Sequence, residues 1–239
     1  MQLQYCSITG ADDAVDIDDL SAIAEEFPFV EWAILLLPSR TGTPRCPTQG
    51  WIEDFSRRCR ARHTAMHLCE DGLLRFIAGE QDVRALMAGF QRIQLNLKFG
   101  DVEGKYDPAD LVARVREAPQ WDFIIQYTPD KKDIVKSFEG IKNHAVLFDA
   151  SAGQGISPEG WDAPLPGHFC GYAGGLNPDN VSENLEKISR VAAGHTTWID
   201  MESGVRTDDR FDLGKVRRVL ELSAPYVLPG AETSIIMGR

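Results

Sequence analysis

Eight short apolar runs recur along the chain, and these runs constrain its fold more than any other feature. Most of them lack the strict alternation of polar and apolar residues that marks a strand with one solvated face, so we expect them to be buried on both faces. The expected strands cover 2–8, 31–38, 64–70, 92–98, 122–128, 144–150, 168–174 and 197–203.

Helical patterns separate these runs, with apolar residues at spacings of three and four. Strands that alternate with helices form a parallel sheet. At 239 residues, the pattern favours an α/β fold in which one domain, 1–239, forms a closed (β/α)8 TIM barrel. An open doubly wound sheet is the alternative. The expected helices cover 16–27, 50–61, 73–90, 107–118, 131–141, 180–192 and 212–224.

One connection departs from this pattern. The stretch 151–167 is rich in Gly and Pro and has room for at most a short helix at 158–161. We therefore expect the helix after the sixth strand to be short or missing. Proline and glycine also cluster at 38–50. In a barrel, both stretches would be loops at the C-terminal rim, where active sites lie.

Charge and composition exclude several classes of partner. The formal net charge of -11 argues against nucleic acid, whose phosphate backbone requires a basic surface. No apolar run reaches the ~20 residues of a membrane-spanning helix, and the N-terminus lacks a secretory signal. We expect a cytoplasmic monomer or homodimer. Five cysteines without a C-x-x-C pair argue against a disulfide framework or zinc site, and the scattered histidines offer no spacing for a metal.

Two residues in strands carry candidate acid–base chemistry. Cys6 lies late in the first strand, and Asp149 ends the sixth. Asp149 follows Val-Leu-Phe directly, and a carboxylate so placed needs a partner or a task. It is either a turn residue or a general acid with a pKa raised by partial burial. Cys6 is either a core cysteine or a base at the barrel mouth.

Two loops of small residues predict a phosphate site. The stretch "YAGGLNPDNV" (172–181) follows the seventh strand and leads into a helix, and "DMESGVR" (200–206) follows the eighth. Helix N-termini and glycine-rich turns attract anions, and the loops after strands 7 and 8 of a barrel commonly share one phosphate. We therefore expect a small phosphorylated substrate. A further candidate is an arginine after the second strand, Arg40 or Arg45, which would hold a carboxylate or remain a solvated loop charge. His67 is interpreted as structural.

With these residues in hand, the chain resembles the phosphoribosylanthranilate isomerase family. "AGGLNPDNV" (173–181) and "IDMESGV" (199–205) are similar to the family's two phosphate-loop motifs. "YCSIT" (5–9), "RIQLN" (92–96) and "LFDAS" (147–151) are similar to its first, fourth and sixth strand motifs. The family catalyses an Amadori rearrangement, an intramolecular oxidoreduction of an aminoaldose phosphate in tryptophan biosynthesis, without metal or organic cofactor.

The resemblance also implies residue roles. It implies Asp149 as the general acid and Cys6 as the general base, both reaching one substrate across the barrel mouth. The residues implied to bind the rest of the substrate are Arg45, Gln94 and Asp200, and those implied to bind its phosphate are Gly174, Gly175, Leu176, Ser203 and Gly204.

Several residues depart from the family pattern. Ser7 replaces a glycine and Asn96 a histidine, the loop 152–157 lacks the usual lysine, and Glu202 would repel a phosphate unless its side chain points away. Three functions therefore remain open. The chain is an isomerase of phosphoribosylanthranilate, a related phosphosugar isomerase or aldolase with another substrate, or a non-catalytic ligand-binding barrel.

Overall fold

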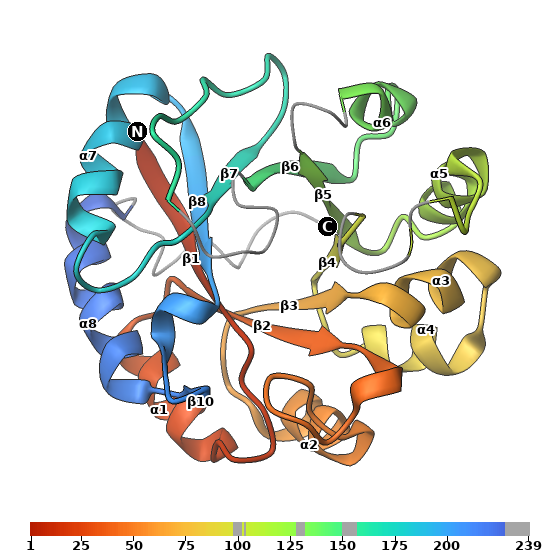
Figure 1. Cartoon of the computed structure of the whole chain (residues 1–239), viewed down its shortest axis with the longest axis horizontal. Coiled ribbons are helices and arrows are strands. Elements are labelled where there is room, and N and C mark those ends of the chain that lie inside the picture. The colour runs from red at the N-terminus through yellow and green to blue at the C-terminus, as the bar shows by residue number, and fades with distance from the viewer. Residues whose placement is uncertain (98–101, 103, 128–131, 150–156, 228–239) are drawn as a thin grey trace.

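Eight parallel strands close into a barrel in chain order (Figure 1). The computed structural model describes residues 1–97, 102, 104–127, 132–149 and 157–227. The barrel closes where β1 pairs with β8, so that Ser7 lies opposite Asp200. The expected closed barrel is thereby confirmed. Its strands are β1 (Gln2–Thr9), β2 (Val30–Leu36), β3 (His63–Leu68), β4 (Arg92–Leu95), β5 (Asp122–Tyr127), β6 (His144–Asp149), β7 (Cys170–Ala173) and β8 (Thr196–Met201).

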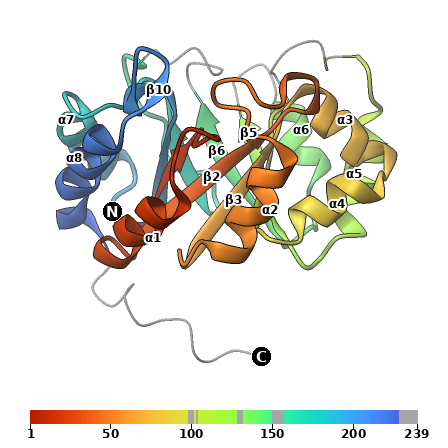
Figure 2. The same cartoon turned by 90° about the horizontal axis from the view of Figure 1, so that it is seen from below.

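Helices surround the barrel, and α1 and α2 face the viewer in Figure 2. Several begin where the sequence places a capping side chain; Asp16, for example, accepts a hydrogen bond from the amide of Asp18. No helix of the described residues has both the length and the apolar character needed to cross a bilayer. The helices are α1 (Ile17–Glu26), α2 (Gln49–Arg58), α3 (Glu70–Ala78), α4 (Gln81–Met87), α5 (Pro108–Arg116), α6 (Lys132–Ser137), α7 (Val181–Val191) and α8 (Leu213–Ser223).

One expected helix is wrong. The segment 73–90 contains the end of α3 and all of α4 instead of a single helix, because Gly79 has a left-handed backbone (φ 82) that ends α3. The expectation for the connection after β6 is met in its described part, where residues 157–169 contain no helix. Its first part, 150–156, with the sequence that lacks the lysine, lies outside the described residues.

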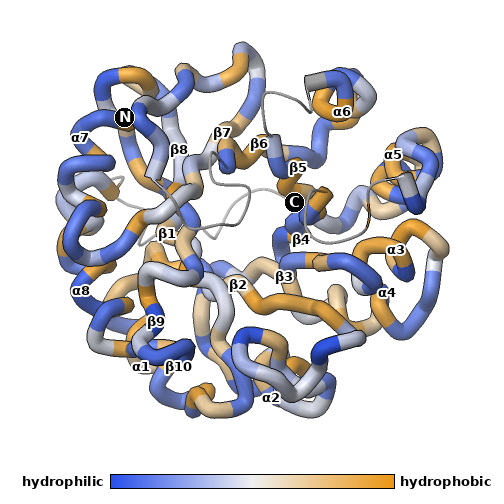
Figure 3. The backbone as a smooth tube through the Cα atoms, in the orientation of Figure 1, coloured by the Kyte–Doolittle hydropathy of each residue, from blue (hydrophilic) through white to orange (hydrophobic). Residues whose placement is uncertain are grey.

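Each strand contributes side chains to two layers, because successive residues point to opposite faces. One layer lies between the strands and the helices. The other fills the barrel itself and includes Ile124, Leu147, Ala173 and Trp198. All seven residues of β2 are buried, as expected for a strand covered on both faces, and Figure 3 shows much of this strand as hydrophobic.

The lower half of the barrel interior, near the strand N-termini, is filled by a buried ion pair. Arg92 opens β4 and donates two hydrogen bonds, of 2.9 and 3.0 Å, to the carboxylate of Glu31 on β2. Its guanidinium carbon lies 4.4 Å from the ring centroid of Trp198. A side chain at Gly171 would collide with that ring, because a Cβ there would lie 2.1 Å from it. These contacts fill the barrel interior near the strand N-termini with side chains.

Candidate active site

A cavity lies at the C-terminal ends of the strands and opens to solvent. Its walls come from β3 to β8 and from the loops after β7 and β8. Eight of the ten residues predicted for the site line this cavity. They are Gln94, Asp149, Gly174, Gly175, Leu176, Asp200, Ser203 and Gly204. Cys6 and Arg45 do not line it.

Two carboxylates face the cavity at the same level of the barrel. Asp149 on β6 and Asp200 on β8 both lie opposite Ala173 of β7, whose small side chain separates them. The two residues are 6% and 9% exposed. Strands β6 and β8 are alternate strands, and in a (β/α)8 barrel the inward side chains of alternate strands form one layer. The fold therefore presents both acids to one ligand.

Each carboxylate has a neutral hydrogen-bond donor. Gln126 Nε2 donates to Asp149 at 2.6 Å, and the hydroxyl of Thr9 donates to Asp200 at 2.7 Å. Burial raises the pKa of Asp200 to about 7; the Thr9 hydrogen bond opposes this, and the charges of Glu202, Asp149 and Glu31 add to it. A carboxyl group with such a pKa can donate or accept a proton near neutral pH.

The loops after β7 and β8 touch through their backbones. Gly174 and Gly175 have φ angles of 134° and 60°, which favour glycine. At Gly204, a Cβ would lie 1.9 Å from the carbonyl oxygen of Leu176. The short 3-10 helix Ser203–Val205 follows β8, and its first two residues line the cavity. Backbone amides so gathered suit an anion.

We call the loops after β7 and β8 together the double loop. Arg45 contacts this double loop and does not line the cavity. Its guanidinium forms ion pairs of 2.7 Å with Glu202 and with Asp209, and Nη1 also donates to the Ser203 hydroxyl at 3.1 Å. Its backbone is left-handed (φ 73), and its amide donates to Asp12 at 2.8 Å. The loop after β2 is thus fastened to the loops after β1 and β8. Glu202 does line the cavity, and Arg45 offsets its charge.

Cys6 points away from the cavity. The neighbouring inward residues are Ser7, which donates to Glu31, and Thr9, which donates to Asp200. Because side chains alternate along a strand, Cys6 faces outward. The expectation that it reaches the barrel mouth is therefore corrected.

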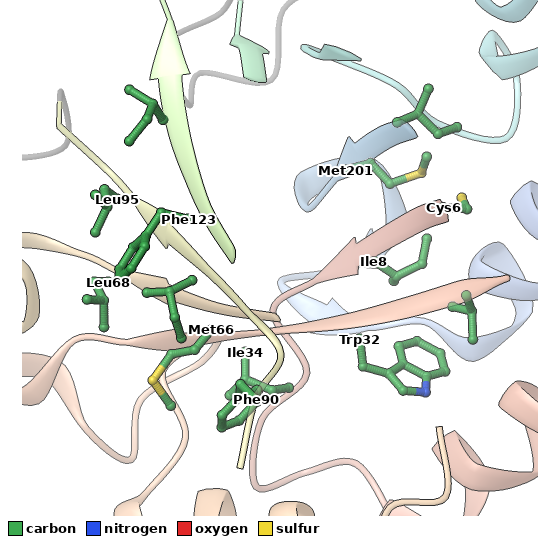
Figure 4. Close-up of a cluster of buried hydrophobic side chains, with 14 of the residues drawn as sticks. Cys6, Ile8, Trp32, Ile34, Met66, Leu68, Phe90, Leu95, Phe123 and Met201 are labelled. Carbon is green, nitrogen blue, oxygen red and sulfur yellow. The ribbon is translucent and has the colours of Figure 1, made fainter. Parts of the chain in front are cut away.

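The surroundings of Cys6 are those of a core residue. It is 0% exposed and lies among apolar side chains such as Ile8 and Met201 (Figure 4). Burial raises the pKa of the thiol. A buried thiol of this kind is inert.

Gln126 and His67 also line the cavity, although the sequence analysis gave neither of them a binding role. Gln126 lies at the end of β5, where it interrupts an apolar run, and its Oε1 is buried without a hydrogen-bond partner. His67 on β3 is 3% exposed, and burial, with the charge of Arg92, lowers its pKa to about 3. Its imidazole is therefore neutral. In both cases the sequence signal is a polar residue in an otherwise apolar strand, at a position whose side chain points into the barrel.

The same wall carries further amides. Gln94 Nε2 donates to Asn96 Oδ1 at 2.7 Å, and both residues line the cavity. Within the described residues, no group of three or more His, Cys, Asp or Glu side chains is arranged to hold a metal ion. The site therefore offers acids, amides and a neutral imidazole for chemistry.

Comparison with known proteins supports the same group of enzymes. Residues 109–222 match the sequence model of the family described as N-(5'phosphoribosyl)anthranilate (PRA) isomerase. The N-(5'-phosphoribosyl)anthranilate isomerase of Geobacillus thermodenitrificans (strain NG80-2) is 29% identical over 153 residues. The match covers 57% of this chain and 64% of that relative, so the chain spans somewhat less than two thirds of the relative's length.

Solved structures share the fold. A phosphoribosylanthranilate isomerase monomer from Thermotoga maritima superposes with a TM-score of 0.59 at 14% identity, over 92% of this chain and 98% of that one. The enzyme from Pyrococcus furiosus gives a TM-score of 0.55 at 13% identity, over 93% and 99%. The chain is thus similar in sequence, over 109–222, to the phosphoribosylanthranilate isomerase family, and it shares the barrel fold of these solved structures.

Proposed function

We propose that the chain is an isomerase that converts a phosphoribosyl amine of the phosphoribosylanthranilate type into the corresponding aminoketose phosphate, as a step of tryptophan biosynthesis. One observation carries the proposal. The cavity joins a double glycine loop after β7 and β8 to two buried carboxylates, Asp149 and Asp200. The names of the relatives supply the reaction, and the cavity supplies an anion site and proton-transfer groups within reach of one small substrate.

The phosphate would bind at the double loop. The backbone amides of 174–176 and 203–205 hold it, because anions bind where several amides converge. Contact between Leu176 and Gly204 keeps the two amide groups at a fixed separation. The negative net charge of the chain does not oppose phosphate binding, because these amides carry local positive partial charges and the Arg45 guanidinium offsets the charge of Glu202.

The reaction then needs an acid and a base. Asp149 donates a proton to the ring oxygen of the sugar, the bond from C1' to that oxygen breaks, and the amine lone pair forms an iminium. Removal of the proton from C2' gives an enolamine, which becomes the aminoketose on tautomerisation. C1' is reduced and C2' oxidised, so no external oxidant is required. A general acid and a general base each raise the reaction rate by about 10²–10⁴-fold.

Arg45 would recognise the carboxylate at the aromatic end of the substrate. In this structure its guanidinium already pairs with Glu202 and Asp209. Binding a substrate carboxylate would therefore require one of these pairs to open. Exchange of one carboxylate for another costs little, because the three groups are partly exposed.

A non-catalytic ligand-binding barrel is the second candidate function, and the outward position of Cys6 favours it. The experiment that separates the two is a direct assay of the purified chain with phosphoribosylanthranilate, alongside growth of a tryptophan auxotroph that lacks this isomerase. Turnover that is lost in Asp149→Asn supports the isomerase. A well-expressed, folded chain that binds phosphate without turnover supports the binding barrel, or an enzyme of another sugar phosphate.

A further inference from the structure

We propose that Asp200, and not Cys6, accepts the proton from C2' of the substrate, so that the reaction runs between two carboxylates on β6 and β8. This inference rests on the proposed isomerase function and assigns the base that the function requires. The resemblance gave that role to Cys6.

Cys6 cannot reach a ligand in the cavity. Its side chain lies on the outer face of β1, is 0% exposed, and packs in the apolar layer between the strands and the helices. To reach the cavity, β1 would have to shift by one residue, which reverses the facing of every side chain in the strand. Such a shift would move Ser7 away from Glu31 and Thr9 away from Asp200. The hydrogen bonds within the barrel therefore hold Cys6 outside.

Asp200 meets the geometric requirements of the base. It lines the cavity beside the loop residues Ser203 and Gly204, and it is level with Asp149 across Ala173. A substrate whose phosphate lies in the double loop would extend its sugar between the two carboxylates. The acid and the base would then lie on opposite sides of the sugar, one for the ring oxygen and one for C2'.

The charges around Asp200 suit it to the role of base. Asp200 is surrounded by Asp149, Glu202 and Glu31, with the neutral His67 on the same cavity wall. Burial and these charges raise the pKa of Asp200 to about 7, so its carboxylate takes up a proton readily near neutral pH. After the reaction Asp149 has lost its proton and Asp200 has gained one, so the pair keeps the same total charge.

Thr9 fixes the orientation of this base. Its hydroxyl donates to Oδ1 of Asp200 at 2.7 Å, which leaves the other carboxylate oxygen for the substrate. We therefore assign Thr9 as a positioning residue. Thr9→Val keeps the shape of the side chain and removes the hydrogen bond. It should shift the pH at which kcat changes, whereas a purely structural role would leave that pH unchanged.

The test compares three variants on the purified full-length chain with phosphoribosylanthranilate. Asp200→Asn should lower kcat by about 10²–10⁴-fold, with inorganic phosphate still raising the melting temperature as it does for the unmodified chain. Cys6→Ala should keep kcat within a few-fold. Asp149→Asn should lose turnover as well. In D2O, the unmodified chain and Cys6→Ala should form product that carries solvent deuterium at C1', where the enolamine is protonated after C2' has lost its proton, and Asp200→Asn should not.

Two results would overturn the assignment in different ways. Turnover that survives in Asp200→Asn and disappears in Cys6→Ala, with phosphate binding retained in both, would return the base role to Cys6 and leave the isomerase function standing. No turnover by the unmodified chain, despite phosphate binding, would overturn the isomerase function and the Asp200 assignment with it.

Discussion

Gly204, in the loop after β8, lies so close to Leu176, in the loop after β7, that a Cβ on the glycine would be 1.9 Å from the carbonyl oxygen of the leucine. The two loops therefore approach at a distance that only glycine permits. Gly204→Ala must push them apart. Overpacking of this kind costs about 1–3 kcal/mol of stability, and it also separates the amides that would hold a phosphate.

We expect Gly204→Ala to weaken the binding of inorganic phosphate by about tenfold or more, equivalent to about 1.4 kcal/mol. The measurement is the phosphate-dependent rise in melting temperature, or calorimetric titration. Gly50→Ala is the matched control, because a Cβ at Gly50 in α2 meets no atom within 4 Å. Equal phosphate affinity in the two variants would place the anion elsewhere.

Asp200 should also make the stability of the protein depend on pH. Its pKa rises from 3.8 to about 7 on folding, so between these values the folded chain binds more protons than the unfolded chain. Stability then falls as pH rises from about 4 to about 7 and levels off above. A difference of this size corresponds to roughly 4 kcal/mol as an upper bound.

The check is urea unfolding of the native chain and of Asp200→Asn between pH 4.5 and 8. The asparagine variant should be the more stable of the two at pH 8, because it buries no charge, and its profile should be flatter. Parallel profiles for the two proteins would contradict the buried, proton-binding state of Asp200.

Gln126 should matter for turnover through Asp149. Its Nε2 donates to the Asp149 carboxylate at 2.6 Å, and hydrogen bonds to charged groups contribute about 1.5–3 kcal/mol. Gln126→Leu keeps the approximate volume and removes the donor that orients the acid. We expect kcat to fall by at least about tenfold, while the melting temperature changes little, because the substitution also removes a buried Oε1 that has no partner. Gln120→Leu, at an exposed position, should leave kcat unchanged.

The sequence predicted the strands and helices better than it predicted whether a given side chain points into or out of the barrel. Apolar runs identified all eight strands, and small residues after β7 and β8 located the double loop, because both are local properties of the chain. The break at Gly79 was missed because glycine is tolerated within helical patterns. The facing of Cys6 could not be read from its neighbours. It is set by distant partners, since Ser7 contacts Glu31 and Thr9 contacts Asp200.

The same limit applies to Arg45 and to Gln126. Nothing near Arg45 in the sequence indicates Glu202 and Asp209, which are more than 150 residues away and become neighbours only when β1 closes on β8. Likewise, the local sequence shows Gln126 only as a polar residue in a strand. The pairing of β5 with β6 places it beside Asp149. Long-range pairing, and not local pattern, assembles the side chains of the cavity.

Arg45 should act on phosphate binding through Glu202. The two side chains form an ion pair of 2.7 Å, and Glu202 lines the cavity next to Ser203. In Arg45→Ala, the carboxylate of Glu202 loses its partner and repels an incoming phosphate. We expect the affinity for inorganic phosphate to fall by about tenfold at low salt, and less at high salt, because partly exposed charges are screened.

A double substitution separates this indirect effect from direct contact between Arg45 and the anion. If Arg45 acts by neutralising Glu202, Arg45→Ala combined with Glu202→Ala should recover the affinity of the native chain, since neither charge remains. Arg40→Ala, an exposed arginine of the same loop, should bind phosphate normally and controls for the loss of a positive charge. A double variant that binds as weakly as Arg45→Ala alone would mean that the guanidinium holds the phosphate itself, and the pair with Glu202 would then be the contact that a ligand displaces.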